Sequence, residues 1–312
     1  MILIPATYKG GIYQHEQIVE LIEDLGGYIV QKHVIAAEVV LQILVPKDDV
    51  DLIRGVAKPL AGTLTLAPLV GTEVAVVSPS LEIHHLPHTS CDIAEYLREF
   101  GAKTNMIGLA RGFGKRIANL NPEERDVINE HDCAVYVLGN FEACIAHKMP
   151  VLRRGVQVPV IVTGAPTTES LKKCVDPPVE GYVGGVGRVM HRFKRPEELQ
   201  KLDEVAAEVS RVLEIRREEI AKDPLSVLPP RLMDVIAAQV PAILDVTSPT
   251  PITVQMAGLR VKLSYGEYAR TIEELEIEEG VRVKDVARVL PSRIRNYILI
   301  RVKPFSDTNI MV

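Results

Sequence analysis

Residues 133–164 decide the fold, and they read CAVYVLGNFEACIAHKMPVLRRGVQVPVIVTG. The apolar run Ala134–Leu138 ends in Gly139-Asn140 and predicts a buried strand. A helix is expected from Phe141 to about Leu152, and the apolar run Pro159–Thr163 predicts the next strand. Strands that alternate with helices in this way are typical of a parallel sheet with helices on its faces.

The same alternation extends toward the N-terminus of this stretch. A helix with one apolar face is expected at Cys91–Phe100, and a strand at Asn105–Leu109. Another helix, Pro122–Glu130, begins after Asn121 as N-cap, with proline at its first position. We therefore predict a parallel α/β middle domain over residues 81–191.

Residues 1–80 follow a different pattern. The apolar strand Ile2–Ile4 comes before a loop at Gly10-Gly11 and a helix. The apolar side of that helix recurs at helical spacing, at Ile18, Leu21, Ile22 and Leu25. Then come one or two strands, a short helix and two further strands, at Tyr28–Val45, Val50–Lys58, Leu64–Leu66 and Val74–Val77. This order is close to βαββαβ and predicts a ferredoxin-like N-terminal domain.

Residues 192–312 are expected to form an α+β C-terminal domain. Glu197–Ile220 predicts a long, charged helix with one apolar stripe. Ile252–Leu263 predicts a β-hairpin with the two-residue turn Ala257-Gly258, and Tyr297–Val302 a last strand. The predicted fold class is thus α/β, with a ferredoxin-like block, a parallel α/β domain and an α+β block in that order.

Composition narrows the class of protein. Of the 312 residues, 47% are hydrophobic and only 4% are aromatic, so we expect aliphatic cores. A net charge of -5 without a basic stripe argues against a nucleic-acid partner. No apolar run reaches the roughly 18 residues of a membrane span, and the N-terminus lacks the pattern of a signal peptide. We therefore expect a cytoplasmic protein that does not bind membranes.

The chain has four cysteines whose spacing fits neither a zinc ribbon nor a CxxC pair: Cys91, Cys133, Cys144 and Cys174. Cys133 begins a predicted central strand and is expected in the core. Cys174 follows two lysines and is expected at the surface. The other two lie in patterns that also fit a metal site.

The segment HHLPHTSC, residues 84–91, contains the first of these patterns. Thr89 or Ser90 can cap the helix that begins at Cys91. Backbone N–H groups and the helix dipole in the first turn favour a thiolate, the form that binds metals. His88 is close enough in sequence to reach the same site. The alternative is a small core cysteine beside solvated histidines.

The second pattern is Cys144 with His147. These residues are three positions apart on one predicted helix, so their side chains share a face. The helix begins just after a parallel strand ends, which is the edge where open α/β sheets bind ligands. A buried cysteine beside a hydrogen-bonded histidine would give the same pattern.

The segment GLARGFGKR, residues 108–116, is rich in glycine and basic residues. Gly112, Gly114 and Lys115 could bind an anion through backbone N–H groups and the ammonium. The segment is not a P-loop, because the first glycine is one residue too far away and Arg116 replaces the required hydroxyl. A flexible basic docking loop, or a lid over a ligand, is the other interpretation.

The motifs together resemble two related families. The whole chain, from MILIPATYKGGIYQHEQIVELIEDLGG onward, resembles methanogenesis marker protein 7. The middle domain also resembles methyl-coenzyme M reductase operon protein C. The shared motifs, in order, are SCDIAEYLREFGA, MIGLARGFGKR, VLGN and KMPVLRRGVQVPVIVTGAP.

This resemblance implies a non-catalytic role in activating methyl-coenzyme M reductase. The nickel cofactor of that enzyme works only as Ni(I), and reaching this state needs low-potential electrons and an ATPase component. In that complex, operon protein C and marker proteins hold complex iron–sulfur clusters. The implied partners are the reductase, operon protein C, other methanogenesis marker proteins and the ATPase activation component.

The resemblance also ranks the possible cluster ligands. Cys91 is the first choice, because operon protein C has a cysteine at the start of the matching helix. Cys144, where the relative has a histidine, follows together with His88 and His147. The chain has too few paired cysteines for a self-contained cluster, so a partner chain would complete or share it.

Two alternatives remain open. One is a small-molecule enzyme that uses the loop Gly112–Gly114, which requires a closed pocket with acid–base groups in the isolated chain. The other is a purely structural adaptor with inert cysteines. Iron and sulfide analysis of the anaerobically purified complex separates the cluster hypothesis from both.

Overall fold

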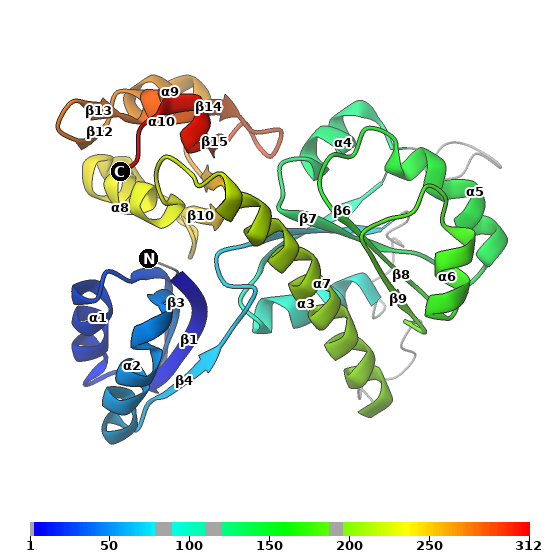
Figure 1. Ribbon diagram of the computed structural model, residues 1–312, viewed down its shortest axis with the longest axis horizontal. Helices are drawn as coiled ribbons and strands as arrows, with labels where there is room; N and C mark the ends of the chain where they lie inside the picture. Colours follow the sequence, from blue (N-terminus) through cyan, green and yellow to red (C-terminus); the bar gives the residue numbers. More distant parts are fainter. Residues whose placement is uncertain (1–2, 79–88, 110–119, 187–195) are drawn as a thin grey trace.

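The computed structural model describes residues 3–78, 89–109, 120–186 and 196–312 (Figure 1). These residues form a four-stranded N-terminal sheet, a five-stranded parallel sheet and a four-stranded C-terminal sheet with a small two-stranded sheet beside it. Figure 1 shows the parallel sheet with its helices on one side of the molecule and the other two domains on the opposite side. The predicted fold class is confirmed.

The N-terminal domain has the predicted order βαββαβ. Its elements are β1 (Leu3–Gly11), α1 (His15–Asp24), β2 (Tyr28–Ile35), β3 (Glu38–Pro46), α2 (Val50–Ala57) and β4 (Thr63–Leu66), with 3-10 turns at Lys47–Asp49 and Lys58–Leu60. The strands are antiparallel in the order β2-β3-β1-β4, and the two helices pack on the sheet through one apolar cluster. This is the ferredoxin-like arrangement.

Strand β1 is longer than the sequence predicts. Gly10 and Gly11, expected in a loop, pair with Val39 and Glu38 of β3. Gly10 is suited to this position because the buried Tyr8 ring lies against it. A Cβ atom on Gly10 would stand 2.1 Å from the Tyr8 hydroxyl oxygen. The glycine therefore makes room for a core tyrosine and does not end the strand.

The middle domain is a parallel sheet with helices on both faces. Its elements are β5 (Glu73–Ser78), α3 (Thr89–Glu99), β6 (Lys103–Gly108), α4 (Pro122–Ile128), β7 (Cys133–Val137), α5 (Glu142–Arg153), β8 (Val160–Gly164), α6 (Thr168–Cys174) and β9 (Gly181–Gly184). The strand order is β6-β5-β7-β8-β9. The predicted capping of α4 is present, since the Asn121 side chain accepts from the Glu124 N–H at 2.7 Å.

Strand β5 lies within residues 1–80, which the sequence analysis assigns to the N-terminal domain. It pairs in parallel with β6 on one side and β7 on the other. All of its residues are buried, because helices cover both faces of the sheet. The strand that follows the ferredoxin-like domain is thus an interior strand of the parallel sheet.

The long helix α7 (Pro196–Lys222) covers one face of that sheet together with α3. Its predicted apolar stripe is buried against the strands: Leu202, Val205, Ala206, Val209, Val212 and Leu213. Helices α4, α5 and α6 cover the opposite face. Across the part of the chain that the structure describes, no helix is both long and apolar enough to cross a membrane.

The C-terminal domain has its own sheet and core. Its elements are α8 (Pro229–Gln239), β10 (Ile252–Gln255), β11 (Gly258–Val261), α9 (Tyr265–Glu273), β12 (Glu276–Glu278), β13 (Val281–Arg282), α10 (Val283–Val286), β14 (Ala287–Pro291), β15 (Ile298–Val302) and α11 (Phe305–Thr308), with a 3-10 turn at Pro241–Ile243. The sheet order is β10-β11-β15-β14, all antiparallel. The predicted hairpin is present as β10 and β11, but its two-residue turn is Met256-Ala257 and not Ala257-Gly258, because Gly258 pairs with Gln255 in the sheet.

A buried ion cluster joins this domain to the amino edge of the parallel sheet. Arg260 of β11 is 2% exposed. Its Nε donates to both carboxylate oxygens of Glu73, at 3.0 and 3.1 Å, and Nη2 donates to Glu73 Oε2 at 3.0 Å. Its Nη1 donates to Glu130 Oε2 at 2.6 Å. Glu73 begins β5 and Glu130 precedes β7, so one guanidinium holds two neighbouring strands.

Asp132 and Gln255 extend the same cluster. The Asp132 carboxylate accepts from the N–H groups of Glu73 at 2.7 Å and Met256 at 3.1 Å. The Gln255 amide donates to the Glu130 carbonyl at 2.7 Å and to the Glu73 carboxylate. Every one of these groups is therefore hydrogen-bonded, as buried polar groups must be to avoid a large desolvation cost.

Replacing Arg260 should test this junction. Arg260→Met leaves the Glu73 and Glu130 carboxylates buried without a counter-charge, so we expect a loss of about 3–5 kcal/mol in the free energy of unfolding. Arg288→Met, on the exposed side of the same sheet, is the matched control and should change it by less than about 0.5 kcal/mol. Urea denaturation measures both, and equal effects of the two variants would contradict the assignment.

Asp132 should make stability depend on pH. Burial raises the pKa of Asp132 to about 6, from an ordinary value of 3.8. The folded chain therefore binds this proton at a pH where the unfolded chain has lost it. Above about pH 6 the ionisation of Asp132 opposes folding. This destabilisation disappears as the pH falls toward about 4. Relative to Asp132→Asn, the native protein should gain about 1–3 kcal/mol between neutral pH and pH of about 4.

Urea denaturation of the native protein and of Asp132→Asn over this pH range gives the difference between their free energies of unfolding. The contributions of the other titrating groups cancel in this difference. A difference that stays constant, or that shifts in favour of Asp132→Asn as the pH falls, would contradict the prediction.

Candidate functional site

The carboxyl ends of the parallel strands form one edge of the middle domain. These ends are Ser78, Gly108, Val137, Gly164 and Gly184. From β5 the chain passes through α3 to β6 on one side, whereas from β7 it passes through α5 to β8 on the other. Neighbouring strands whose connections diverge in this way form a topological switch point, where open α/β sheets bind ligands.

Cys91 lies close to this edge. It is the third residue of α3, the helix that follows β5, and its side chain is exposed and free of any disulfide. Its neighbour Ser90 is buried. Thr89 and Ser90 already lie within α3, so neither is its N-cap as predicted, but Cys91 is still in the first helical turn. Its exposure does not support the reading of Cys91 as a core residue.

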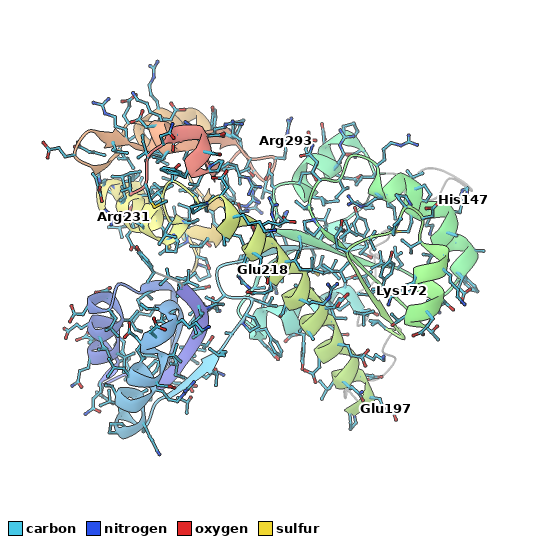
Figure 2. The ribbon with its side chains drawn as sticks, in the orientation of Figure 1. His147, Lys172, Glu197, Glu218, Arg231 and Arg293 are labelled. Atoms are coloured by element: carbon cyan, nitrogen blue, oxygen red, sulfur yellow. The ribbon has the colours of Figure 1, made fainter. Side chains whose placement is uncertain are left out.

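Cys144 and His147 lie at the same edge on α5. Cys144 is half-buried in the first turn, where its backbone N–H donates to the Phe141 carbonyl at 3.0 Å. His147 is exposed one turn later, on the outer side of the domain (Figure 2). Phe141, just before the helix, is 76% exposed. Cys144 and His147 are three positions apart on α5, so their side chains lie on the same side of this helix.

Helices α3 and α5 pack on opposite faces of the sheet. Cys91 and Cys144 thus approach the carboxyl edge from different sides. Among residues 3–78, 89–109, 120–186 and 196–312, no group of three or more His, Cys, Asp or Glu side chains is arranged to hold a metal ion. Neither cysteine has a complete set of ligands within the described residues.

Four residues of the predicted site lie outside the described residues. They are His88, in the connection from β5 to α3, and Gly112, Gly114 and Lys115, in the connection from β6 to α4. Both connections leave the carboxyl edge of the sheet.

The two remaining cysteines differ from Cys91. Cys133 is fully buried in β7, and burial raises the pKa of its thiol, so it stays neutral in the core as expected. Cys174 is half-buried at the C-terminal end of α6, where its thiol donates to the Leu171 carbonyl at 3.6 Å. Partial burial also raises the pKa of Cys174.

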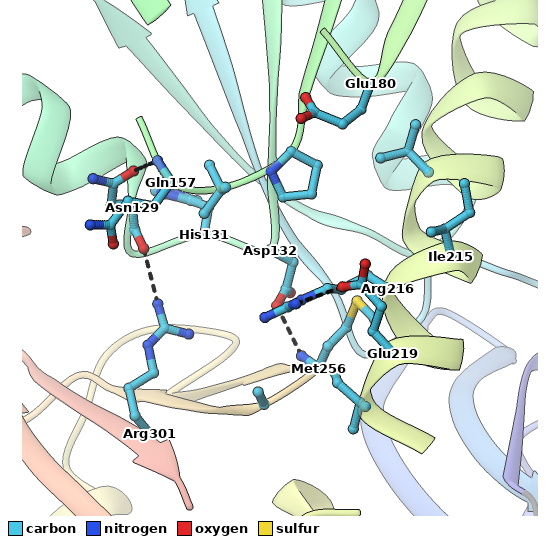
Figure 3. A pocket seen from close by; sticks show the side chains of 15 residues that line it. Asn129, His131, Asp132, Gln157, Glu180, Ile215, Arg216, Glu219, Met256 and Arg301 are labelled. Carbon is cyan, nitrogen blue, oxygen red and sulfur yellow. Dashed lines mark hydrogen bonds and ion pairs between the residues drawn. The ribbon is translucent and has the colours of Figure 1, made fainter. Parts of the chain in front are cut away.

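A pocket that the sequence analysis missed lies at the opposite, amino edge of the sheet (Figure 3). Its volume is about 460 Å³, within the range of small-molecule sites. It lies between the starts of β7, β8 and β9, the second half of α7, the β10–β11 turn and β15. It is lined by Asn129, His131, Asp132, Gln157, Val158, Pro159, Glu180, Val212, Ile215, Arg216, Glu219, Ile220, Met256, Ala257 and Arg301.

These lining residues come from six separate segments of the chain, so no single local motif in the sequence could indicate the pocket. The sequence feature that could have indicated this region is a charged residue in each of two apolar C-terminal strands, Arg260 and Arg301. A charge in such a strand needs a buried partner.

Sequence comparison connects the chain to methanogens. The family described as methyl-coenzyme M reductase operon protein C matches residues 3–275. An uncharacterized protein of Methanocaldococcus jannaschii is 44% identical over 300 residues, covering 96% of this chain and 94% of that protein. The methyl-coenzyme M reductase I operon protein C of the same organism is 29% identical over 113 residues, covering 33% of this chain and 56% of that protein.

Solved structures are more distant. A Vibrio parahaemolyticus protein of unknown function covers 36% of this chain and 92% of its own, with 12% identity and a TM-score of 0.19. A hypothetical protein covers 64% of this chain and 87% of its own, with 13% identity and a TM-score of 0.22. TM-scores this low do not establish a shared fold. The family match, in contrast, extends into all three domains, and the chain belongs to the methyl-coenzyme M reductase operon protein C family.

Proposed function

We propose that the protein is a non-catalytic, cluster-carrying component of the ATP-dependent complex that activates methyl-coenzyme M reductase. Membership of the family associates the chain with the methyl-coenzyme M reductase system. The observation that supports a cluster-carrying role is the exposed Cys91 thiol in the first turn of α3, at the carboxyl edge of the parallel sheet.

An exposed thiol at a helix N-terminus is chemically suited to bind iron. Cysteine binds iron through its sulfur as the thiolate, and the first turn of a helix presents the positive end of the helix dipole to such a ligand. Because the thiol is exposed, a cluster held by a second protein can reach it. A buried thiol such as Cys133 could not take this part.

The ligands within the described residues fit a shared cluster better than a self-contained one. Cys91 is the proposed main ligand, with Cys144 and His147 on α5 as further proposed donors, and His88 is a proposed donor outside the described residues. The described residues include no group of three metal-binding side chains. The remaining ligands would therefore come from a partner chain, and the complex iron–sulfur cluster would lie between subunits.

The same edge carries features suited to a partner. Phe141, 76% exposed, offers an apolar contact beside α5. The basic loop with Gly112, Gly114 and Lys115 would offset the negative charge of a thiolate-bound cluster or bind an acidic surface. The proposed partners are the reductase, operon protein C, other methanogenesis marker proteins and the ATPase component, with the protein acting in the cytoplasm.

Cys91→Ala should lower the iron and sulfide content of the complex purified without oxygen. We expect most of the bound iron to be lost while the chain stays folded, since the Cys91 side chain is exposed. Cys174→Ala is the matched control, because Cys174 ends α6 on the side of the sheet away from the carboxyl edge. Metal analysis and circular dichroism are the measurements.

Iron content that is unchanged in Cys91→Ala would remove this residue from the site. A complex that contains no iron with any variant would support the structural adaptor in place of the cluster carrier.

The isolated chain should not bind magnesium ATP. The loop 108–116 has Arg116 where a P-loop has the serine or threonine that binds magnesium. Titration calorimetry with magnesium ATP should therefore give no saturable heat. Saturable binding at micromolar concentration, abolished by Lys115→Ala, would support the enzyme alternative instead.

A further inference from the structure

The pocket at the amino edge of the sheet is separate from the cysteine-bearing edge. Figure 3 shows the side chain of Arg301 on one side and those of Ile215, Arg216 and Glu219 from α7 on the other. The β10–β11 turn, with Met256, lies between the two sides. Its walls therefore come from two domains and differ in chemistry.

Arg301 supplies a cation without an ion-pair partner in the part of the chain that the structure describes. Its Nη1 donates to the Gln255 amide oxygen at 3.0 Å and its Nη2 to the Asn129 carbonyl at 3.3 Å. Both acceptors are neutral, and other N–H donors of the guanidinium fork remain. A half-buried guanidinium with only neutral partners favours an anion.

The nearest carboxylate of the pocket does not fill this role. Asp132 accepts from two backbone N–H groups, those of Glu73 and Met256. Asp132 influences Arg301 electrostatically, as Glu73 and Glu130 do less strongly, but the described residues include no ion pair between Asp132 and Arg301. Within the described residues, the Arg301 guanidinium is therefore the group of the pocket that an incoming anion would pair with.

The other charges limit how negative that anion can be. Glu180 already pairs with Arg153 at 3.1 Å and accepts from the Val160 N–H at 2.7 Å. Glu219 pairs with Arg216 at 2.7 Å. Both carboxylates are balanced by their own partners but still line the pocket. A phosphate or a dicarboxylate would be repelled more strongly by them than a ligand with one negative charge, and among the described lining residues Arg301 is the guanidinium that forms no ion pair.

The opposite wall is aliphatic. Val212 and Ile215 of α7 line it, together with Val158 and Met256. Ile215 is 46% exposed although it lies in a concave region. Covering it with an apolar group would remove this surface from water, at roughly 25 cal/mol per Å².

We propose that this pocket binds a small organic monocarboxylate, whose carboxylate pairs with Arg301 and whose apolar portion lies against Ile215 and Met256. A bound ligand of this kind bridges β15 of the C-terminal domain and α7 on the parallel sheet. The proposal is independent of the cluster-carrying role and involves neither Cys91 nor any residue at the carboxyl edge.

Titration calorimetry of the full chain with octanoate tests the proposal, with octanol as the uncharged probe. Octanoate should bind at least about tenfold more tightly than octanol, because only the carboxylate pairs with Arg301. Ile215→Trp fills the pocket from an exposed helix position and should weaken octanoate binding by at least about tenfold. Leu199→Trp is the control, since Leu199 is 38% exposed on the same helix outside the pocket.

Arg301→Gln should remove the preference for octanoate over octanol, with folding checked by thermal melting because Arg301 also bonds Gln255 and Asn129. The proposal is overturned if octanoate does not bind or binds no better than octanol. It is equally overturned if Ile215→Trp and Leu199→Trp affect octanoate binding to the same extent.

Discussion

The bidentate pairing of Arg260 with Glu73, completed by Glu130, is the interaction on which the relation between the domains depends. Burying three charges costs several kcal/mol per ion, which only a fully hydrogen-bonded set can offset. Once formed, the set has little freedom, because each carboxylate is fixed at the start of a parallel strand. It therefore fixes the C-terminal sheet on the amino edge of the parallel sheet and places the β10–β11 turn and Arg301 beside α7.

This arrangement gives the two edges of the parallel sheet different roles. The C-terminal domain occupies the amino edge, and its contacts there enclose a pocket. The carboxyl edge carries the N-termini of α3 and α5, with an exposed cysteine and an exposed phenylalanine. A partner protein and a small ligand could thus be bound at opposite ends of the same strands without competing for space.

Local patterns predicted many of the elements, but not α6, β9, α8 or α9, and they did not predict how the elements assemble. Helix–strand alternation predicted the parallel sheet, and the βαββαβ order predicted the N-terminal domain. The position of β5 was harder to predict, because a short apolar run fits either the N-terminal sheet or the parallel sheet. In the structure every residue of β5 is buried, as an interior strand of a parallel sheet requires. Cys91 could be placed near the start of α3 because the helical pattern is local, although the predicted caps, Thr89 and Ser90, lie inside the helix. The ion cluster between the C-terminal domain and the parallel sheet could not be predicted, because Glu73, Glu130 and Arg260 meet only through tertiary contacts.

The distance in sequence between these charges has a consequence for how the chain is made. Glu73 and Arg260 are 187 residues apart. During synthesis, β5 to β9 leave the ribosome well before β11 exists, so the amino edge of the nascent sheet has its carboxylates exposed to water and cannot close over them. Contacts this non-local form slowly. The junction at the amino edge of the parallel sheet can therefore form only after the last third of the chain has been synthesised.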